Sequence, residues 1–209
     1  MIMMYVQHFG SKPSQKFSSP LEGGDHPEVD SSEFLDATEM QLYQSLIGAL
    51  QWAVPIGRFD ITTAVMTLSG FRTMPRHGHL DCVKCVYSYL SKMKDAMTCV
   101  PTADPNYSGL PDQAFYWAQM VYGDVSKILP KDAPPPLGKY VTLMHYVDAN
   151  LYHNMLTGHS VTGILHLMNK MPINWYSKKK QATVETATYG SEFIEAHTCV
   201  DQVIYLHTT

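Results

Sequence analysis

The sequence predicts an α+β fold, in which a short helical subdomain precedes a unit with the element order β-β-β-α. Three observations support this class. Apolar residues recur at helical spacing over residues 38–98. After residue 138 they alternate with a period of two, as in half-buried strands. Residues 99–138, which lie between the two patterns, are rich in proline and predict an extended connector.

The helical subdomain is predicted to contain three amphipathic helices. The first follows Asp36, which is spaced from Glu39 as in a capping box. The second follows Asp60, a residue type favoured at the N-cap, and the third runs from Leu80 to Lys94. Helices this short depend on tertiary packing, so their apolar faces must contact one another or a partner. The apolar positions of these faces are Leu42, Tyr43, Leu46, Ile47, Leu50, Ile61, Ala64, Val65, Leu68, Phe71, Val83, Val86, Tyr87, Leu90 and Met93.

The later part of the chain is predicted to form three strands and a helix. Alternation predicts strands over residues 140–150, 161–168 and 173–177, and residues 169–172 predict a hairpin turn. A helix is expected over residues 184–206. Its expected buried stripe comprises Tyr189, Phe193, Ala196, Val200, Val203 and Ile204.

Composition and charge limit the class of protein. The 209 residues are 45% hydrophobic, which is enough for a core and excludes wholesale disorder. The net charge of −4 excludes a basic field over the whole molecule. The acids are concentrated near the N-terminus, where residues 1–37 predict a flexible acidic linker. No apolar window is long enough for a membrane-spanning helix, and the four cysteines do not suggest a disulfide scaffold, so an intracellular location is expected.

Two carboxylates suggest metal-dependent chemistry. Asp148 lies near the end of a predicted strand, and Glu192 lies in the predicted C-terminal helix. An Asp and a Glu at one sheet edge can hold Mg²⁺, and two such ions can clamp the attacking and leaving oxygens of a phosphodiester. The spacing of the two residues in the sequence is equally compatible with two solvent-exposed acids that bind no metal, so both interpretations stay open at this point.

Two other motifs were weighed as sites. Cys82 and Cys85, with His77 and His79 nearby, could form a zinc site. However, both cysteines fall inside the third predicted helix, where a cysteine more often acts as a small buried hydrophobe. Ser191 is rejected as a nucleophile, because no strand precedes it and the sharp turn of a serine hydrolase is missing.

A basic cluster follows two aromatic residues. Lys178, Lys179 and Lys180 come directly after Trp175, Tyr176 and a serine. Such a cluster can follow a nucleic-acid backbone while the rings stack on bases. The alternative is a solvated strand end, which these residues favour when they are considered alone.

Taken together and in order, the motifs resemble copia-type retrotransposon polyproteins. Residues 38–98 resemble the thumb or connection region that follows the reverse transcriptase active site, whose own paired-Asp motif is absent here. Residues 139–209 resemble the N-terminal part of the ribonuclease H domain. The segments that carry the resemblance are residues 43–50, 57–61, 79–90, 146–150, 157–163, 173–181 and 191–193.

The resemblance implies a truncated ribonuclease H-like unit and an ancestral activity, the metal-dependent hydrolysis of RNA in RNA–DNA hybrids. Asp148 matches the family's first metal-binding Asp, and Glu192 matches its catalytic Glu, with Mg²⁺ as the cofactor. The family's further acids come on later strands and have no counterpart before Thr209. We therefore expect a fragment or a degenerate copy with little or no nuclease activity.

The resemblance also implies partners and a location. The partners are an RNA–DNA hybrid or single-stranded nucleic acid and the remainder of the polyprotein, with no membrane. Nucleic-acid contacts are expected from Asn150 and from Lys178, Lys179 and Lys180. The location is the cytoplasm, within an element particle, or the nucleus. Two alternatives remain open, namely a non-catalytic module that binds nucleic acid and a translated remnant without function.

Overall fold

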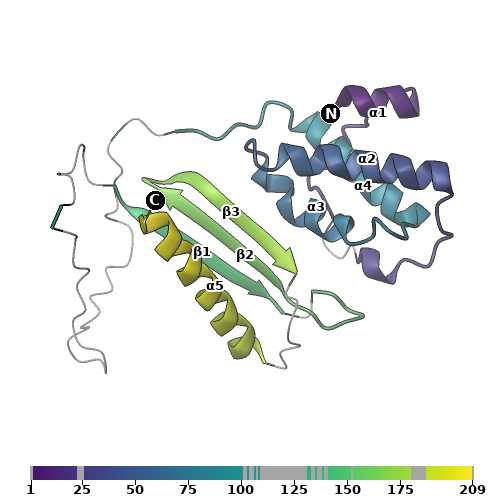
Figure 1. The fold of residues 1–209 in the computed structure, drawn as a ribbon. Coiled ribbons are helices and arrows are strands. Elements are labelled where there is room, and N and C mark those ends of the chain that lie inside the picture. Colours follow the sequence, from purple (N-terminus) through teal and green to yellow (C-terminus); the bar gives the residue numbers. More distant parts are fainter. Residues whose placement is uncertain are drawn as a thin grey trace.

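The computed structural model describes residues 2–22, 26–100, 103, 106, 108, 131, 132, 135, 138, 141–151, 153–179 and 187–208. Within them, four helices form one unit, and a three-stranded sheet with a fifth helix forms another (Figure 1). The predicted α+β class is therefore confirmed, whereas most of the predicted connector lies outside the described residues. The helical unit comprises α1 (Ile2–Phe9), η1 (Pro27–Val29), α2 (Ala37–Ala53), η2 (Phe59–Ile61), α3 (Thr62–Ser69) and α4 (His77–Lys92). The sheet unit comprises β1 (Leu143–Asn150), β2 (Val161–Met168), β3 (Met171–Lys179) and α5 (Thr188–Thr208).

Helix α2 begins with the predicted capping box. The Asp36 carboxylate accepts a hydrogen bond from the backbone N–H of Glu39 at 2.8 Å, and the Glu39 carboxylate accepts one from the backbone N–H of Asp36 at 3.2 Å. The backbone N–H groups of Asp36 and Glu39, which have no carbonyl partner within the helix, are thereby hydrogen-bonded. The helix ends at Ala53, just before Pro55, whose ring cannot continue it.

The second predicted helix begins differently. The 3-10 turn η2 precedes α3, and Asp60 lies inside that turn, so the prediction of Asp60 as the N-cap is wrong. Its carboxylate accepts hydrogen bonds from Arg58 at 3.0 and 2.8 Å and from the Tyr89 hydroxyl at 2.9 Å. These partners occupy the oxygens that a cap would use, and they tie η2 to α4.

A single apolar core joins the helices of the first unit, as the three amphipathic patterns predict. The hydroxyls of Tyr43 and Tyr87 lie inside it and donate to the carbonyl oxygens of Leu68 at 2.7 Å and Leu46 at 3.2 Å. Both buried rings therefore keep their polar ends satisfied. The predicted core residues that are buried are Tyr43, Leu46, Ile47, Leu50, Ile61, Ala64, Val65, Leu68, Val83, Val86, Tyr87 and Leu90. Leu42, Phe71 and Met93 are half-buried.

The N-terminal segment contains a helix that the sequence analysis did not predict. Helix α1 places the Tyr5 ring 5.3 Å from the Tyr87 ring of α4 and 4.5 Å from the Phe9 ring. Tyr5 is buried in the same core as α2 to α4. The prediction of a flexible linker over residues 1–37 is therefore wrong for Ile2–Phe9, because aromatic contacts with α4 stabilise a helix too short to be stable alone.

His79 fixes the segment before α2 onto the start of α4, which begins earlier than predicted. The His79 Nδ1 accepts a hydrogen bond from the backbone N–H of Arg76 at 3.0 Å, and its Nε2 lies 2.8 Å from the Pro27 carbonyl oxygen. The backbone of Gly78 lies so close to Asp30 that an added Cβ would be 2.6 Å from the carboxylate. Glycine thus permits this close approach of the two segments.

We expect the stability of the helical unit to fall as the pH drops below about 6.5, the ordinary pKa of histidine. Burial lowers the pKa of His79, so the unfolded chain takes up this proton more readily than the folded chain. The contribution of His79 is then complete above the unfolded pKa and is lost as the pH falls through the folded pKa. Urea unfolding at several pH values should show a smaller loss in His79→Gln than in the parent. Equal pH dependence in both chains would contradict this role, since most carboxylates titrate nearer pH 4.

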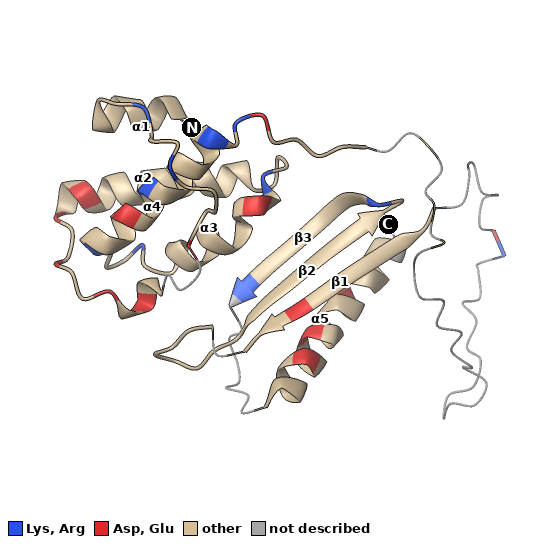
Figure 2. Ribbon diagram, turned by 180° about the vertical axis from the view of Figure 1, so that it is seen from behind, with Lys and Arg blue, Asp and Glu red and all other residues tan. Residues whose placement is uncertain are grey.

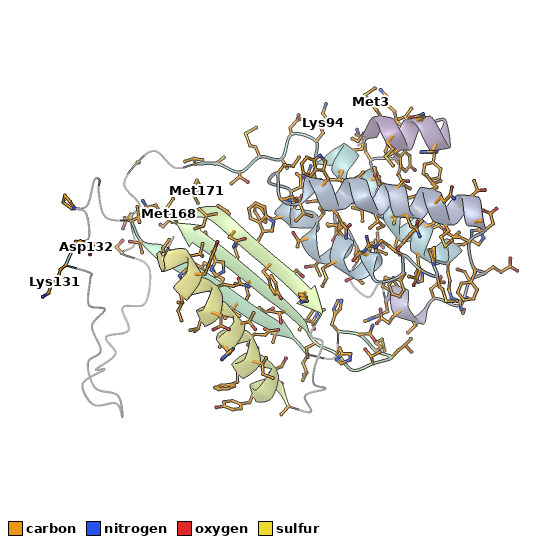
Figure 3. All side chains as sticks on the ribbon, in the orientation of Figure 1. Met3, Lys94, Lys131, Asp132, Met168 and Met171 are labelled. Carbon is orange, nitrogen blue, oxygen red and sulfur yellow. The ribbon has the colours of Figure 1, made fainter. Side chains whose placement is uncertain are left out.

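The sheet has the order β1-β2-β3, with both pairs antiparallel and β2 in the centre. The strand predictions are confirmed, with β2 matching its predicted bounds and β3 extending further at both ends. Asn169 and Lys170 have φ values of 49° and 66°, which closes the predicted hairpin with a two-residue turn. Met168 and Met171 flank this turn (Figure 3). Pro172 is tolerated because β3 pairs only with β2 among the residues that the structure describes, and the register shifts beside it.

Helix α5 lies along the sheet, but it buries a different stripe from the one predicted. Its buried side chains are Ser191, Glu195 and Cys199. The predicted stripe is wrong, because Tyr189, Phe193, Ala196, Val200 and Ile204 are exposed and Val203 is only half-buried. The sheet face that α5 covers includes the buried Thr162, Ile164 and His166, and His166 is within hydrogen-bond distance of Gln202 of α5.

Candidate nucleic-acid site

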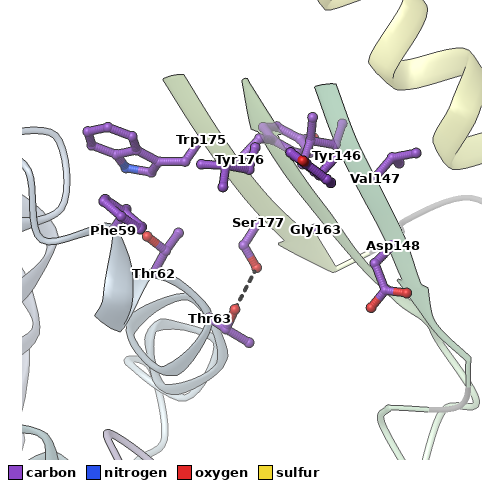
Figure 4. Close-up of a pocket in the computed structure, with 12 residues that line it drawn as sticks. Phe59, Thr62, Thr63, Tyr146, Val147, Asp148, Gly163, Trp175, Tyr176 and Ser177 are labelled. Carbon is purple, nitrogen blue, oxygen red and sulfur yellow. Dashed lines mark hydrogen bonds between the residues drawn. The ribbon is translucent and has the colours of Figure 1, made fainter. Parts of the chain in front are cut away.

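A cleft of about 400 Å³ lies between the helical unit and one face of the sheet. Phe59 of η2 and Thr63 of α3 line the cleft on the side of the helical unit, where they meet β3. The Phe59 and Trp175 ring centroids are 5.2 Å apart, and the Thr63 and Ser177 hydroxyls are 3.3 Å apart (Figure 4). These two contacts join the units along the edge of β3.

The floor of the cleft consists of two rows across the three strands. In one row Tyr146, Leu165 and Trp175 are paired, and in the next row Asp148, Gly163 and Ser177 are paired. Alternation puts Asp148 on the same face as Tyr146, since side chains two apart on a strand share a face. The same alternation in the sequence predicts that Asp148 faces away from Val147, whereas the contact of this face with η2 and α3 depends on the tertiary structure.

Asp148 is exposed, and Figure 4 shows its carboxylate on the side of the sheet that carries Ser177. Helix α5 covers the other face, where His166 is completely buried. Glu192 lies in the second turn of α5 and is half-buried. The acidic residues of α5 run beside β1 (Figure 2), but Asp148 and the side chains that α5 contacts belong to opposite faces of that strand.

This arrangement decides how the two predicted metal ligands could act together. Among the described residues, β1 pairs with β2 only, so its other edge has no neighbouring strand. For Asp148 and Glu192 to bind one ion, the Glu192 side chain must reach round that edge. Carboxylate oxygens such as those of Asp148 and Glu192 suit Mg²⁺. However, the two carboxylates belong to opposite faces of the sheet and do not form one preformed site. Nor do the described residues contain a group of three His, Cys, Asp or Glu side chains placed to hold a metal ion.

A polar network that the sequence analysis did not identify lies between the sheet and α5. The Nδ1 atoms of His145 and His166 are 2.7 Å apart, and the His166 Nε2 is 2.9 Å from the Gln202 Oε1. Since an amide oxygen only accepts, Nε2 of His166 is the donor to Gln202, and in a neutral His166 ring Nδ1 would then accept from His145. Glu195 is also fully buried on this side of α5. The sequence signal for this network is that His145 and His166 take positions on their strands that alternation assigns to the same face of the sheet.

The predicted nucleic-acid contacts gather at one end of the sheet, as far as they are described. Asn150 ends β1, and its register partner Val161 pairs in turn with Lys179. The Asn150 amide nitrogen is 3.0 Å from His153 Nδ1, and Lys178 is exposed. Lys180 lies outside the described residues.

The structure also places residues of the candidate zinc motif and the serine rejected as a nucleophile. Cys82 is half-buried against the helical core, and His79 is bonded to backbone atoms as described above. Ser191 lies within α5 and is completely buried against the sheet. Among the described residues, no helix is both long and apolar enough to cross a membrane.

Comparison with known proteins relates the chain to retrotransposon polyproteins. It is 27% identical over 176 residues to a Saccharomyces cerevisiae protein described as belonging to transposon Ty5-1, with 84% of this chain covered. It is 24% identical over 207 residues to the retrovirus-related Pol polyprotein from transposon TNT 1-94 of Nicotiana tabacum, with 96% of this chain covered. The aligned parts are 45% and 13% of those two proteins, so the chain spans less than half of either. No protein-family profile matches the chain, and no solved structure matches it.

Proposed function

We propose that the chain is the part of a copia-type retrotransposon polyprotein that comprises the reverse transcriptase connection region and the N-terminal part of the ribonuclease H domain. The matches to two transposon-encoded proteins support a polyprotein origin. The order of a helical unit followed by β-β-β-α supports the finer assignment, since it follows the order of the resembling motifs. The remainder of such a polyprotein is then the natural structural partner of this chain, and its location is intracellular.

The activity proposed for this chain is binding of nucleic acid, either an RNA–DNA hybrid or a single strand, without appreciable hydrolysis. The observation that carries this conclusion is the position of Asp148 on the sheet face opposite α5. Hydrolysis of a phosphodiester by two ions needs several carboxylates directed at the same place. A single exposed carboxylate would hold Mg²⁺ weakly, because this ion keeps most of its water ligands unless a site is preformed.

A hybrid cleavage assay tests this proposal. The full chain is incubated with a labelled RNA–DNA hybrid in Mg²⁺, alongside Asp148→Asn and Glu192→Gln. We expect the parent and both variants to release product at the same background rate. Robust cleavage that either substitution abolishes would overturn the proposed lack of hydrolysis. It would show that Asp148 and Glu192 act as metal ligands, as the resemblance implies.

Binding is measured separately from cleavage. The dissociation constant for the hybrid should rise with salt concentration, since phosphate contacts by lysines release counterions. We expect Lys178→Ala to weaken binding and to reduce this salt dependence, whereas Lys12→Ala, at an exposed position in the N-terminal segment, should change neither. Absence of binding to the hybrid and to single strands at low salt would overturn the proposed function.

A further inference from the structure

We infer that the cleft between η2, α3 and the sheet binds a single unpaired nucleobase of a nucleic-acid strand. This inference deepens the proposed function and rests on it, because it names what part of a nucleic acid enters the cleft. A cleft of about 400 Å³ falls within the range of small-ligand sites, which begins at roughly 300 Å³.

Aromatic rings stand at both ends of the first row of the floor. Trp175 lies at one end beside Phe59, and Tyr146 lies at the other end with 53% of its surface exposed. Leu165 lies between them in the row and makes the centre of this part of the floor apolar. An exposed ring on a sheet is a surface on which any base can stack, since every base has a π-face.

The second row has polar groups at its ends and no side chain in its centre. Asp148 and Ser177 flank Gly163, which is the middle residue of the row. The two outer strands are roughly 9.5 Å apart, twice the spacing of neighbouring strands. A flat ring can therefore lie over Gly163, with a hydrogen-bond acceptor at one end and a hydroxyl at the other.

The charges of the lining distinguish a base from a phosphate. Among the described residues that line the cleft, none is Lys, Arg or His, and the single charged group is the Asp148 carboxylate. A carboxylate repels a phosphate but accepts hydrogen bonds from an exocyclic amino group. The preferred occupants are therefore the amino-bearing bases adenine, cytosine and guanine, with their phosphates directed outside the cleft.

The test compares two oligonucleotides of equal length by fluorescence anisotropy, one of deoxyadenosine and one of abasic deoxyribose phosphate. Because one stacked base contributes on the order of 1 kcal/mol or more, we expect the parent to prefer the deoxyadenosine strand by at least about fivefold. Trp175→Leu should remove this preference. Trp52→Leu, at a position on α2 with 72% exposure, is the matched control and should retain it.

A second variant guards against loss of structure in Trp175→Leu. In Gly163→Ala the added Cβ meets only the Asp148 carbonyl oxygen at 3.7 Å, an ordinary contact, so the sheet should keep its stability. The methyl group nevertheless raises the floor where the ring would lie, and the preference for deoxyadenosine should fall severalfold. Retention of the full preference in both variants would overturn the inference.

The outcomes also separate the inference from the proposed function. If the parent binds the two single strands equally but still binds the RNA–DNA hybrid, the inference is wrong and the proposed function stands. If the parent binds neither single strand nor hybrid, both are wrong. If the parent prefers deoxyadenosine strands, Trp175→Leu and Gly163→Ala lose this preference and the hybrid is not bound, the cleft assignment holds and the hybrid is removed as a partner.

Discussion

Replacing Leu46 with alanine is expected to lower the free energy of unfolding of the helical unit by about 3 kcal/mol. Leu46 is completely buried in α2, within the core that α1, α3 and α4 share. The substitution removes apolar contacts and leaves a cavity that close-packed neighbours fill only in part. The carbonyl oxygen of Leu46 also accepts from the Tyr87 hydroxyl, so a shift of α2 would strain that bond.

Urea unfolding monitored by circular dichroism measures this loss, and amide hydrogen exchange shows where it occurs. Exchange should accelerate throughout α2 and α4, because both contribute to the same core. Trp52→Ala is the matched control on the same helix, and this exposed position should change stability by less than about 0.5 kcal/mol. Similar losses in the two variants would mean that the core does not depend on Leu46.

Replacing His166 with alanine is expected to destabilise the sheet unit by about 3 kcal/mol. His166 is completely buried and connects the sheet to α5 through His145 and Gln202. The substitution creates a cavity and also removes the hydrogen-bond partner of the half-buried Gln202 side chain. Faster exchange in α5 and β1, with no change in α2, would follow from this local role.

His197→Ala provides the control for the histidine network. His197 is on the same helix but is largely exposed, and it lies 3.5 Å from Asp201. An exposed ion pair of this kind contributes little to stability, so the change should stay below about 1 kcal/mol. If His197→Ala were as destabilising as His166→Ala, the network between α5 and the sheet would not explain the effect.

Elements that are determined by contacts between residues close in the sequence could be predicted from the sequence. The capping box at Asp36 and Glu39 depends on atoms three residues apart, and the structure confirms it. The turn at Asn169 and Lys170 lies between two alternating segments, and both strands follow as predicted. In each case the deciding contacts lie close together in the sequence.

Features that depend on distant partners could not be predicted in the same way. The periodicity of α5 favours burial of Phe193, but the helix instead buries Ser191, Glu195 and Cys199. Helix α1 is short, and the contact that stabilises it is with Tyr87. For the candidate site, alternation set the face of Asp148, but only the tertiary arrangement shows which face α5 covers.

The contact between Tyr5 and Tyr87 has a consequence for the order in which the chain folds. Each strand of the sheet pairs with its neighbour in sequence, so the connections between the strands are shorter than the separation of α1 from α4. Helix α1 instead waits for α4, which is synthesised after α2 and α3. Among the described helices of this unit, the contact of α1 with α4 can therefore form only after α4 has been synthesised, and the apolar side chains of α1 stay in water until then.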